Sequence, residues 1–217
     1  MLDIGGPIRV TEYGGDGPLI LLIHGLGGST ENWDVTGPLL TGRGHVAAVD
    51  LAGFGESVPG DRRPSVEDNA LLVAEVIDAL GFEAAVLVGN SMGGLVSMIT
   101  AVEHAPRVDR LVLVNPALPV SRRHPPDLEV LAKLIGPLVP GIGVPAFRIY
   151  RAAHSPEEET NETLRMVASD PETVPAWAQE RLTEANRRRR RHEWAIPSFL
   201  EADRSIARYV LRPRRFT

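Results

Sequence analysis

The segment GNSMG at residues 89–93 constrains the fold of this chain more than any other. It fits the pattern G-x-S-x-G and lies between a short apolar run at 85–88 and a helix-compatible run at 94–102. A serine at such a sharp strand-to-helix corner, called the elbow below, takes a strained backbone conformation. The outer glycines remove side chains that would collide there. The pattern therefore predicts an exposed nucleophile at Ser91, at a helix N-terminus whose dipole favours developing negative charge.

Two more glycine-rich turns follow apolar runs earlier in the chain. The run at 19–23 is continuously apolar, as in a parallel strand that is covered on both faces, and it ends in HGLGG at 24–28. The run at 46–49 leads into DLAGFGES at 50–57. A glycine-rich loop after the first of these strands places a backbone N–H beside the elbow serine, and the residue after the serine supplies a second N–H.

In this order and at these spacings, the motifs HGLGG, DLAGFGES and GNSMGG resemble the α/β-hydrolase superfamily. The resemblance is close over roughly residues 8–118, and it is specific for the fold but not for the substrate. It implies an α/β fold with a mostly parallel sheet and helices on both faces. It also implies that Ser91 is the nucleophile and that the N–H groups of Leu26 and Met92 form the oxyanion hole. The supporting motif residues are His24, Gly25, Gly27, Gly89 and Gly93.

The first half of the chain alternates between strand and helix patterns, which predicts a parallel sheet with right-handed crossovers. We expect strands at 8–13, 19–23, 46–49, 85–88 and 108–114, and helices around 31–41, at 66–80 and after the elbow. Ser65 is the predicted N-cap of the helix at 66–80, and Gly81 is its predicted stop.

The pattern changes after residue 118. Residues 119–217 contain many prolines, several helical patterns and no convincing strand. The resembled family carries a helical cap at this point, so we divide the chain into a core at 1–118 and a cap at 119–217. Caps exclude water and shape the pocket. The proline-containing stretches at 125–126 and 136–141 are interpreted as loops or hinges of this cap.

A serine nucleophile needs a base and an orienting acid. In the resembled family the acid follows a strand beyond the cap, and the histidine follows the last strand. Neither pattern occurs before Thr217, so we expect the last strands, the acid and the histidine to be missing and the chain to be truncated at its C-terminus. Some relatives carry an acid after the strand that follows the elbow, but this position is Asn115 here, and Asp127 lies well inside the cap.

The six histidines have structural interpretations. His24 supports the oxyanion loop, His45 precedes a strand at the opposite edge of the sheet, and His104 lies at the far end of the elbow helix. The cap histidines, which stay open as alternative bases for Ser91, are His124, His154 and His192. Four large aromatic residues are interpreted as core residues, with pocket lining as the alternative: Trp33, Phe54, Trp177 and Trp194.

The formal net charge of −5 is unevenly distributed. Residues 181–217 carry 11 basic and 4 acidic groups, including a run of five arginines at 187–191. Such a run is compatible with an anionic substrate, nucleic acid or a membrane surface. No set of stacking aromatic residues and no nucleic-acid motif accompanies it. We therefore interpret it as a solvated helix face beside an acidic body, and expect neither nucleic acid nor a membrane as partner.

Composition excludes several other classes. The absence of cysteine excludes disulfides and thiolate metal sites. No apolar run approaches the roughly 18 residues of a membrane-spanning helix, and residues 1–6 lack the features of a signal peptide, so we expect a cytoplasmic protein. The sequence contains no phosphate-binding loop, no H-E-x-x-H and no clustered carboxylates, which predicts neither a metal nor an organic cofactor.

Two functional hypotheses follow. The first is a serine hydrolase that cleaves a small-molecule carboxylic ester or related acyl substrate through an acyl-enzyme at Ser91. A serine nucleophile argues against haloalkane dehalogenases and epoxide hydrolases, which use a carboxylate, while perhydrolases and C–C bond hydrolases share the same motifs. The alternative is a non-catalytic protein that binds a small molecule or a partner. If the last strands are missing, the strand at 110–114 forms an exposed sheet edge through which the chain self-associates.

Overall fold

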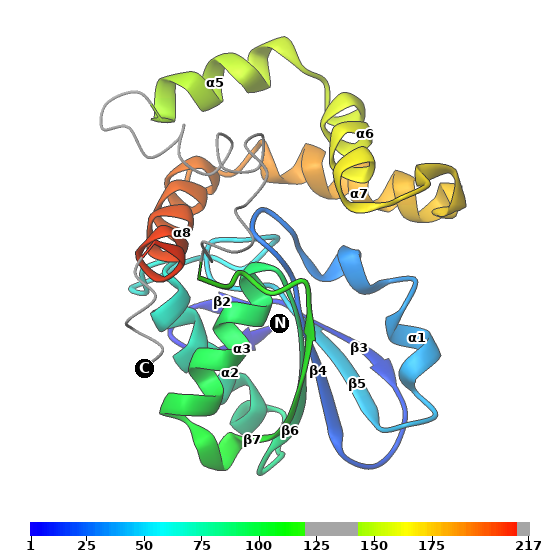
Figure 1. Cartoon of the computed structure of the whole chain (residues 1–217), viewed down its shortest axis with the longest axis vertical. Coiled ribbons are helices and arrows are strands. Elements are labelled where there is room, and N and C mark those ends of the chain that lie inside the picture. The colour runs from blue at the N-terminus through cyan, green and yellow to red at the C-terminus, as the bar shows by residue number, and fades with distance from the viewer. Residues whose placement is uncertain (120–142, 212–217) are drawn as a thin grey trace.

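The computed structural model describes residues 1–119 and 143–211. Its centre is a five-stranded sheet in the order β3-β5-β4-β6-β7 (Figure 1). The strands are β3 (Val10–Gly14), β4 (Leu19–Ile23), β5 (His45–Val49), β6 (Ala85–Asn90) and β7 (Val108–Val114). β3 runs antiparallel to β5 and the other neighbours are parallel, which confirms the predicted α/β class with a mostly parallel sheet. A two-stranded hairpin of β1 (Leu2–Asp3) and β2 (Pro7–Ile8) precedes the sheet.

Helices cover both faces of the sheet, as predicted. The α-helices are α1 (Gly37–Leu40), α2 (Val66–Ala79), α3 (Met92–Glu103), α5 (Gly143–Ala153), α6 (Pro156–Val167), α7 (Ala176–Arg189) and α8 (Ala195–Val210). Short 3₁₀ helices occur at η1 (Thr30–Trp33), η2 (Ala105–Arg107) and η4 (Pro171–Thr173). None of the helices in the described residues has both the length and the hydrophobicity that crossing a bilayer requires.

The core lies on both sides of β4, whose side chains are all buried. On one face, Leu19, Leu21 and Ile23 join a large cluster with residues of α2 and α3. The same cluster contains three residues of α8, namely Ala202, Ile206 and Tyr209. On the other face, a smaller cluster combines the alternate residues of β4 with Trp33, and Leu40 of α1 packs against it. Figure 1 shows α2, α3 and α8 on one side of the sheet and α1 on the other.

The predicted helix around 31–41 is wrong, because η1 and α1 are two separate short helices. Pro38 lies in the first turn of α1. Proline has no N–H to donate within a helix and fits best at its start, so the sequence begins a new helix here. The predicted strand at 8–13 is likewise divided, since β2 ends at Ile8 and β3 begins at Val10. Between them, the Arg9 N–H donates to the Ser57 hydroxyl at 2.9 Å instead of continuing a ladder.

Other predicted elements agree closely with the structure. β7 covers the predicted 108–114, and α2 begins at the predicted residue 66. The Ser65 hydroxyl accepts a hydrogen bond from the Asp68 N–H at 3.1 Å, as expected of an N-cap. Gly81 follows the helix end with a φ of +82°, as expected of its stop.

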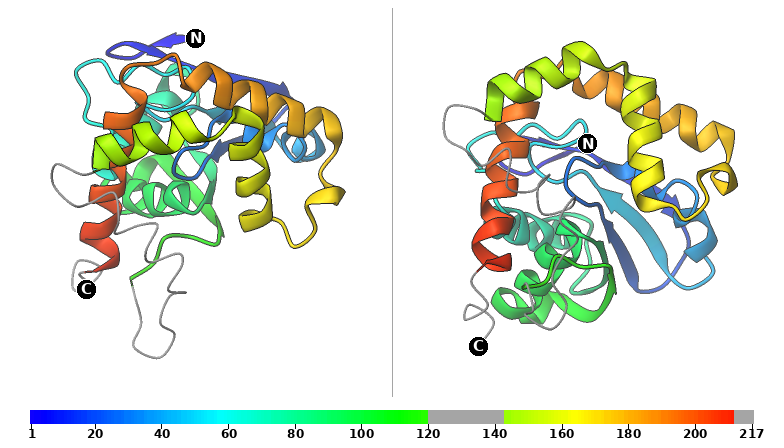
Figure 2. Two further views of the ribbon diagram at one scale, coloured as in Figure 1. Left: turned by 90° about the horizontal axis from the view of Figure 1, so that it is seen from above. Right: turned by 45° about the horizontal axis from the view of Figure 1, so that its top comes forward.

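Residues 143–211, called the helical segment below, contain α5 to α8. Figures 1 and 2 show α5, α6 and α7 as a layer at the end of the sheet where the parallel strands finish, while α8 runs from that layer down beside α2 and α3. The segment thus covers the sheet end that carries the glycine-rich loops. The division into core and cap at residue 118 stays a prediction, and the proposed hinges at 125–126 and 136–141 lie outside the described residues.

Candidate active site

Ser91 lies at the corner between β6 and α3 with a φ of +51° and a ψ of −113°. The predicted positive φ is therefore present. A non-glycine residue in this region carries strain of order 1–3 kcal/mol, which the surroundings must offset. The Ser91 N–H donates to the Val114 carbonyl at 3.0 Å, and the Ser91 carbonyl accepts from the Ala117 N–H at 3.0 Å. The backbone on both sides of the serine is thus fixed to the segment that follows β7.

The glycines of the elbow allow this corner to form. A Cβ at Gly89 would lie 2.6 Å from the Ser97 Oγ, and one at Gly93 would lie 2.6 Å from the His24 carbonyl oxygen. Both distances are below those that real Cβ atoms show. The space therefore admits only glycine at these positions, as the sequence motif predicts.

The glycine-rich loop at 24–28 lies directly beside Ser91. A Cβ at Gly25 would be 3.3 Å from the Ser91 Cβ, so the loop backbone approaches the serine closely. Met92 is the first residue of α3, and the first N–H groups of a helix have no partner within it. The structure thus brings together Ser91, the loop that contains Leu26, and the start of α3. The role of the Leu26 and Met92 N–H groups as an oxyanion hole stays a prediction.

His24 connects this loop to the next one. Its Nε2 lies 3.1 Å from the Leu51 N–H, which can only donate, so Nε2 accepts and Nδ1 carries the proton. Nδ1 then donates to the Gly25 carbonyl at 2.7 Å. Burial lowers the pKa of His24 to about 4, so the ring is neutral near pH 7. Both nitrogens are occupied, so His24 has a positioning role.

Asp50 is a site residue whose role the sequence analysis did not assign. Its buried carboxylate accepts from the Thr30 N–H at 2.6 Å and the Glu56 N–H at 2.8 Å, and thereby connects two loops. Burial raises the pKa of Asp50 to about 6, although these hydrogen bonds and Arg9, 3.7 Å away, favour its charged form. Gly55 leaves room for this carboxylate. The signal in the sequence was the glycine-rich turn directly after Asp50.

The other histidines in the described residues form no hydrogen bond with Ser91. His45 pairs with Glu12 at 2.8 Å, His154 stacks on Tyr150, and His192 stacks on Trp194. Within residues 1–119 and 143–211, the Ser91 hydroxyl has no hydrogen-bond partner. His124 and Asp127 lie outside these residues. The described part of the chain therefore supplies neither a base nor an acid to the serine, and in it no three His, Asp or Glu side chains gather into a metal site.

The arginine run is not the solvated helix face that we expected. The Arg188 guanidinium donates to Glu31 at 2.6 Å and to Glu56 at 2.9 Å, and Arg189 donates to the Gly27 carbonyl. These contacts connect α7 to the loops beside Ser91. The expectation failed because the acidic partners are distant in sequence and approach α7 only in the folded chain. Arg187 and Arg191 do fit it, since both are exposed and Arg187 pairs with exposed glutamates.

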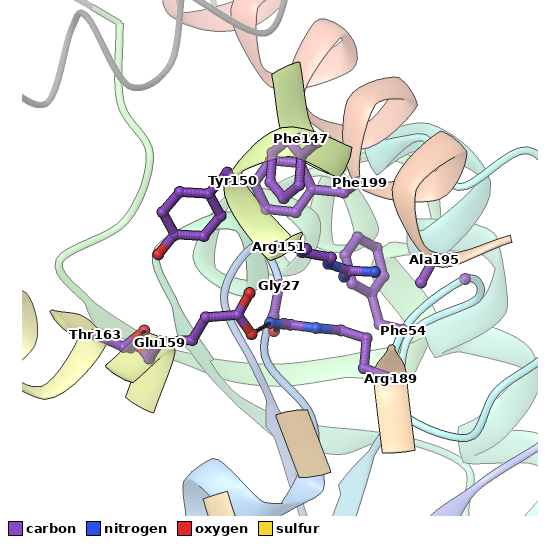
Figure 3. A pocket seen from close by; sticks show the side chains of 11 residues that line it. Gly27, Phe54, Phe147, Tyr150, Arg151, Glu159, Thr163, Arg189, Ala195 and Phe199 are labelled. Atoms are coloured by element: carbon purple, nitrogen blue, oxygen red, sulfur yellow. Dashed lines mark hydrogen bonds and ion pairs between the residues drawn. The ribbon is translucent and has the colours of Figure 1, made fainter. Parts of the chain in front are cut away.

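A cavity of about 110 Å³ lies between the helical segment and the glycine-rich loops (Figure 3). Gly27 and Phe54 form its floor, and Phe147, Arg151 and Arg189 are among the side chains that surround it. Ser91 is not among the residues that line it. Of the four predicted aromatic core residues, Trp33 is buried, Phe54 is buried and also lines the cavity, Trp177 is largely exposed, and Trp194 stacks on His192.

The alpha/beta hydrolase fold model matches residues 18–204. This chain belongs to the alpha/beta hydrolase fold family. It is 38% identical over 109 residues to the dihydrolipoyllysine-residue acetyltransferase component of the acetoin cleaving system of Cupriavidus necator, a match that covers 50% of the chain and 29% of that protein. It is 35% identical over 109 residues to 2-hydroxy-6-oxo-6-phenylhexa-2,4-dienoate hydrolase of Comamonas testosteroni, covering 47% of the chain and 37% of the relative.

The structure is also similar to that of wild-type Cfl2 from Burkholderia cenocepacia. The TM-score is 0.78 at 20% sequence identity, and the match covers 96% of this chain and 70% of the other. This likeness shows the fold alone. In sequence, the matches to the two curated relatives span about half of this chain and about a third of their own length.

Proposed function

We propose that this alpha/beta hydrolase fold chain carries the nucleophile of a serine hydrolase that cleaves carboxylic esters or related acyl compounds. The observation that carries the proposal is the backbone of Ser91, with its φ of +51° at the first turn of α3. A strained corner of this kind persists only where the surroundings hold it, and such strain clusters at functional sites. The close approach of Gly25 brings a second backbone segment, the loop at 24–28, to the same site.

In the proposed reaction the Ser91 Oγ attacks the acyl carbonyl and forms an acyl-enzyme, which water then cleaves. The N–H groups of Leu26 and Met92 stabilise the oxyanion, and the N-terminal end of α3 adds a favourable dipole. The helical segment covers this end of the sheet and acts as a cap that excludes water. His24 orients the loop of Leu26 through its bond to the Gly25 carbonyl.

The residue that acts as general base in this mechanism is not among the described histidines. His24, His154 and His192 are each bonded or stacked elsewhere. We infer that the base comes from His124 or from a residue outside these 217 residues. The chain by itself is then expected to hydrolyse esters poorly, because oxyanion stabilisation and binding without a base leave only about 10³–10⁴ of acceleration over water.

Labelling and hydrolysis test the proposal together. We expect a fluorophosphonate probe to label Ser91 slowly, with the adduct located by peptide mass spectrometry. Ser91→Ala should abolish this labelling, while the residual hydrolysis of p-nitrophenyl acetate that depends on the oxyanion hole and binding persists. A turnover number above about 1 s⁻¹ would place the base within this chain. Single substitutions of His124, His154 and His192 by alanine would then identify it.

A non-catalytic binding protein is the second candidate. It is supported by the Ser91 hydroxyl, which has no hydrogen-bond partner within residues 1–119 and 143–211. If the probe labels wild type no faster than Ser91→Ala, this candidate replaces the first. A relative named as a hydrolase of 2-hydroxy-6-oxo-6-phenylhexa-2,4-dienoate also keeps C–C bond hydrolysis as a variant of the first candidate.

A further inference from the structure

The cavity beside Gly27 combines aromatic walls with buried cations (Figure 3). Arg151 enters it from α5 and Arg189 from α7, while Phe147 and Phe199 lie with their ring centroids 4.8 Å apart in the same wall. Its volume of about 110 Å³ is smaller than the roughly 300 Å³ at which drug-sized pockets begin. The space therefore suits a small ligand, or one end of a longer one.

Positive charge exceeds negative charge around this cavity. Among the described residues that line it are two arginines, Arg151 and Arg189, and one carboxylate, that of Glu159, and Arg190 adds a further positive charge close to both arginines. Glu159 lies 3.1 Å from Arg190 but 3.9 Å from Arg189, so its close partner is Arg190. Burial, and then the nearby charge of Arg151, lower the pKa of Arg189 to about 10. The surroundings of Arg189 thus lack the negative charge that would compensate its burial.

Two donors in this cavity have no acceptor among the described residues. There, the Nε atoms of Arg151 and Arg189 are both buried without a hydrogen-bond partner. A buried donor that is left unpaired costs about 1–3 kcal/mol, and more where the group is charged. Native structures rarely carry such a cost without a reason, and a role in binding is one.

We propose that this cavity binds the carboxylate of a small carboxylic acid between Arg151 and Arg189, with the apolar body of the acid against Phe147 and Phe199. Guanidinium groups bind carboxylates through paired, charge-assisted hydrogen bonds, which supply the missing acceptors. This proposal rests on the proposed function, because it takes the bound acid to be the substrate of Ser91. That substrate then carries a carboxylate in addition to the acyl carbonyl that Ser91 attacks. The loop at 24–28 contacts both places, because Gly25 approaches Ser91 and Arg189 binds the Gly27 carbonyl.

Calorimetric titration of the Ser91→Ala chain with benzoate and with its neutral counterpart benzamide tests the site without any turnover. We expect benzoate to bind at least tenfold more tightly than benzamide. Arg151→Gln should remove this preference, since a hydrogen bond to a charged group accounts for about a tenfold change. The matched control is Arg187→Gln, which removes an exposed arginine of α7 outside the cavity and should leave benzoate binding unchanged.

Equal binding of benzoate and benzamide would overturn the inference, as would equal weakening by Arg151→Gln and Arg187→Gln. If Arg151→Gln fails to fold, the benzoate preference of the Ser91→Ala chain decides by itself. The cavity could bind the carboxylate of the substrate or that of a separate effector. Comparing the rates at which 4-nitrophenyl hydrogen glutarate and neutral 4-nitrophenyl pentanoate are cleaved distinguishes the two. Faster cleavage of the glutarate supports the inference, and equal cleavage of both by an active chain overturns the substrate assignment while leaving the serine hydrolase intact.

Discussion

The loops around Ser91 and the helical segment are held in place by different forces. At Gly89 and Gly93, backbone segments approach so closely that no side chain fits, and His24 joins two loops through the hydrogen bonds of a neutral ring. The helical segment instead reaches these loops through charged groups, above all Arg188 and Arg189 of α7. α8 joins the apolar core, but α5, α6 and α7 lie outside it.

This difference has a functional consequence. Close backbone packing fixes the serine corner in one geometry, as a preorganised site requires. Ion pairs at a partly exposed boundary contribute little stability individually, so the layer of α5 to α7 can open at small cost. A fixed serine corner beneath an adjustable helical layer would suit the proposed hydrolase, which must admit a substrate and then exclude water.

The largest expected effect is at the fixed loops. Gly93→Ala places a methyl group against the carbonyls of Ile23 and His24, which are backbone atoms that cannot yield locally. We expect it to lower the free energy of unfolding by about 3 kcal/mol, the upper range for an overpacked site. Urea unfolding measures this.

Gly42→Ala is the matched control for this prediction. Gly42 lies in a turn where nothing is within 4 Å of an added Cβ and where φ is not positive. Alanine there should leave stability unchanged or raise it by about 0.5 kcal/mol, through the entropy of the unfolded chain. Equal losses for Gly93→Ala and Gly42→Ala would show that the serine corner is no tighter than an open turn.

The same contrast explains what the sequence could predict. The serine corner, the N-cap at Ser65 and the strand at 108–114 depend on residues that are close together in the chain, so their patterns were legible. The bond between Arg188 and Glu31 joins residues 157 positions apart, and no local pattern reports it. For the same reason the role of Asp50 and the cavity between helices far apart in the sequence were missed. Features that depend on neighbouring residues can be predicted from sequence motifs, whereas the partners of charged side chains depend on the completed fold.

A second effect concerns the one part of the helical segment that joins the core. Asp203 of α8 is 1% exposed, and neither carboxylate oxygen has a hydrogen-bond partner within residues 1–119 and 143–211. Burial raises the pKa of Asp203 to about 7. Asp203→Asn removes the buried charge, so we expect the free energy of unfolding at pH 8 to rise by about 2 kcal/mol. Urea unfolding across a pH series measures it.

The pH dependence fixes the sign of this effect. The folded chain retains the Asp203 proton up to about pH 7, while the unfolded chain loses it near pH 4, so wild-type stability falls as the pH rises between these values. Asp50, with its pKa of about 6, acts in the same direction. At pH 4 the gain from Asp203→Asn should vanish. Asp16→Asn, at an exposed position, should show no gain at pH 8, and a gain equal to that of Asp203→Asn would exclude burial as the cause.

A smaller effect is expected at the charged boundary. Arg188→Gln removes the contacts to Glu31, whose side chain is 2% exposed, and to Glu56. Glu31 retains Arg9 at 2.7 Å, so we expect a loss of only about 1 kcal/mol, with faster proteolysis within the helical segment. Arg187→Gln breaks exposed pairs and should change neither quantity. A loss as large as that of Gly93→Ala would mean that the cover is as fixed as the loops.

The smallest effect on folding is expected at the edge of the sheet. Within the described residues β7 pairs only with β6, and Val112 on it is 47% exposed. An apolar edge strand with unpaired N–H and C=O groups is a template for association. We therefore expect the wild-type chain to self-associate through residues 110–114 and Val112→Lys to shift it toward monomer. Unfolding should change by no more than about 0.5 kcal/mol, because the side chain is already half exposed.

Light scattering across a range of concentrations measures this association. Val102→Lys is the matched control, since Val102 is 81% exposed but lies on α3, away from the edge. If association occurs through the strand edge, Val112→Lys should shift the chain toward monomer and Val102→Lys should not. If an added charge only improves solubility, both substitutions should act equally. A wild-type chain that stays monomeric at every concentration, with slow amide exchange along 110–114, would show that this edge is covered. The edge strand would then be held in place as firmly as the loops around Ser91.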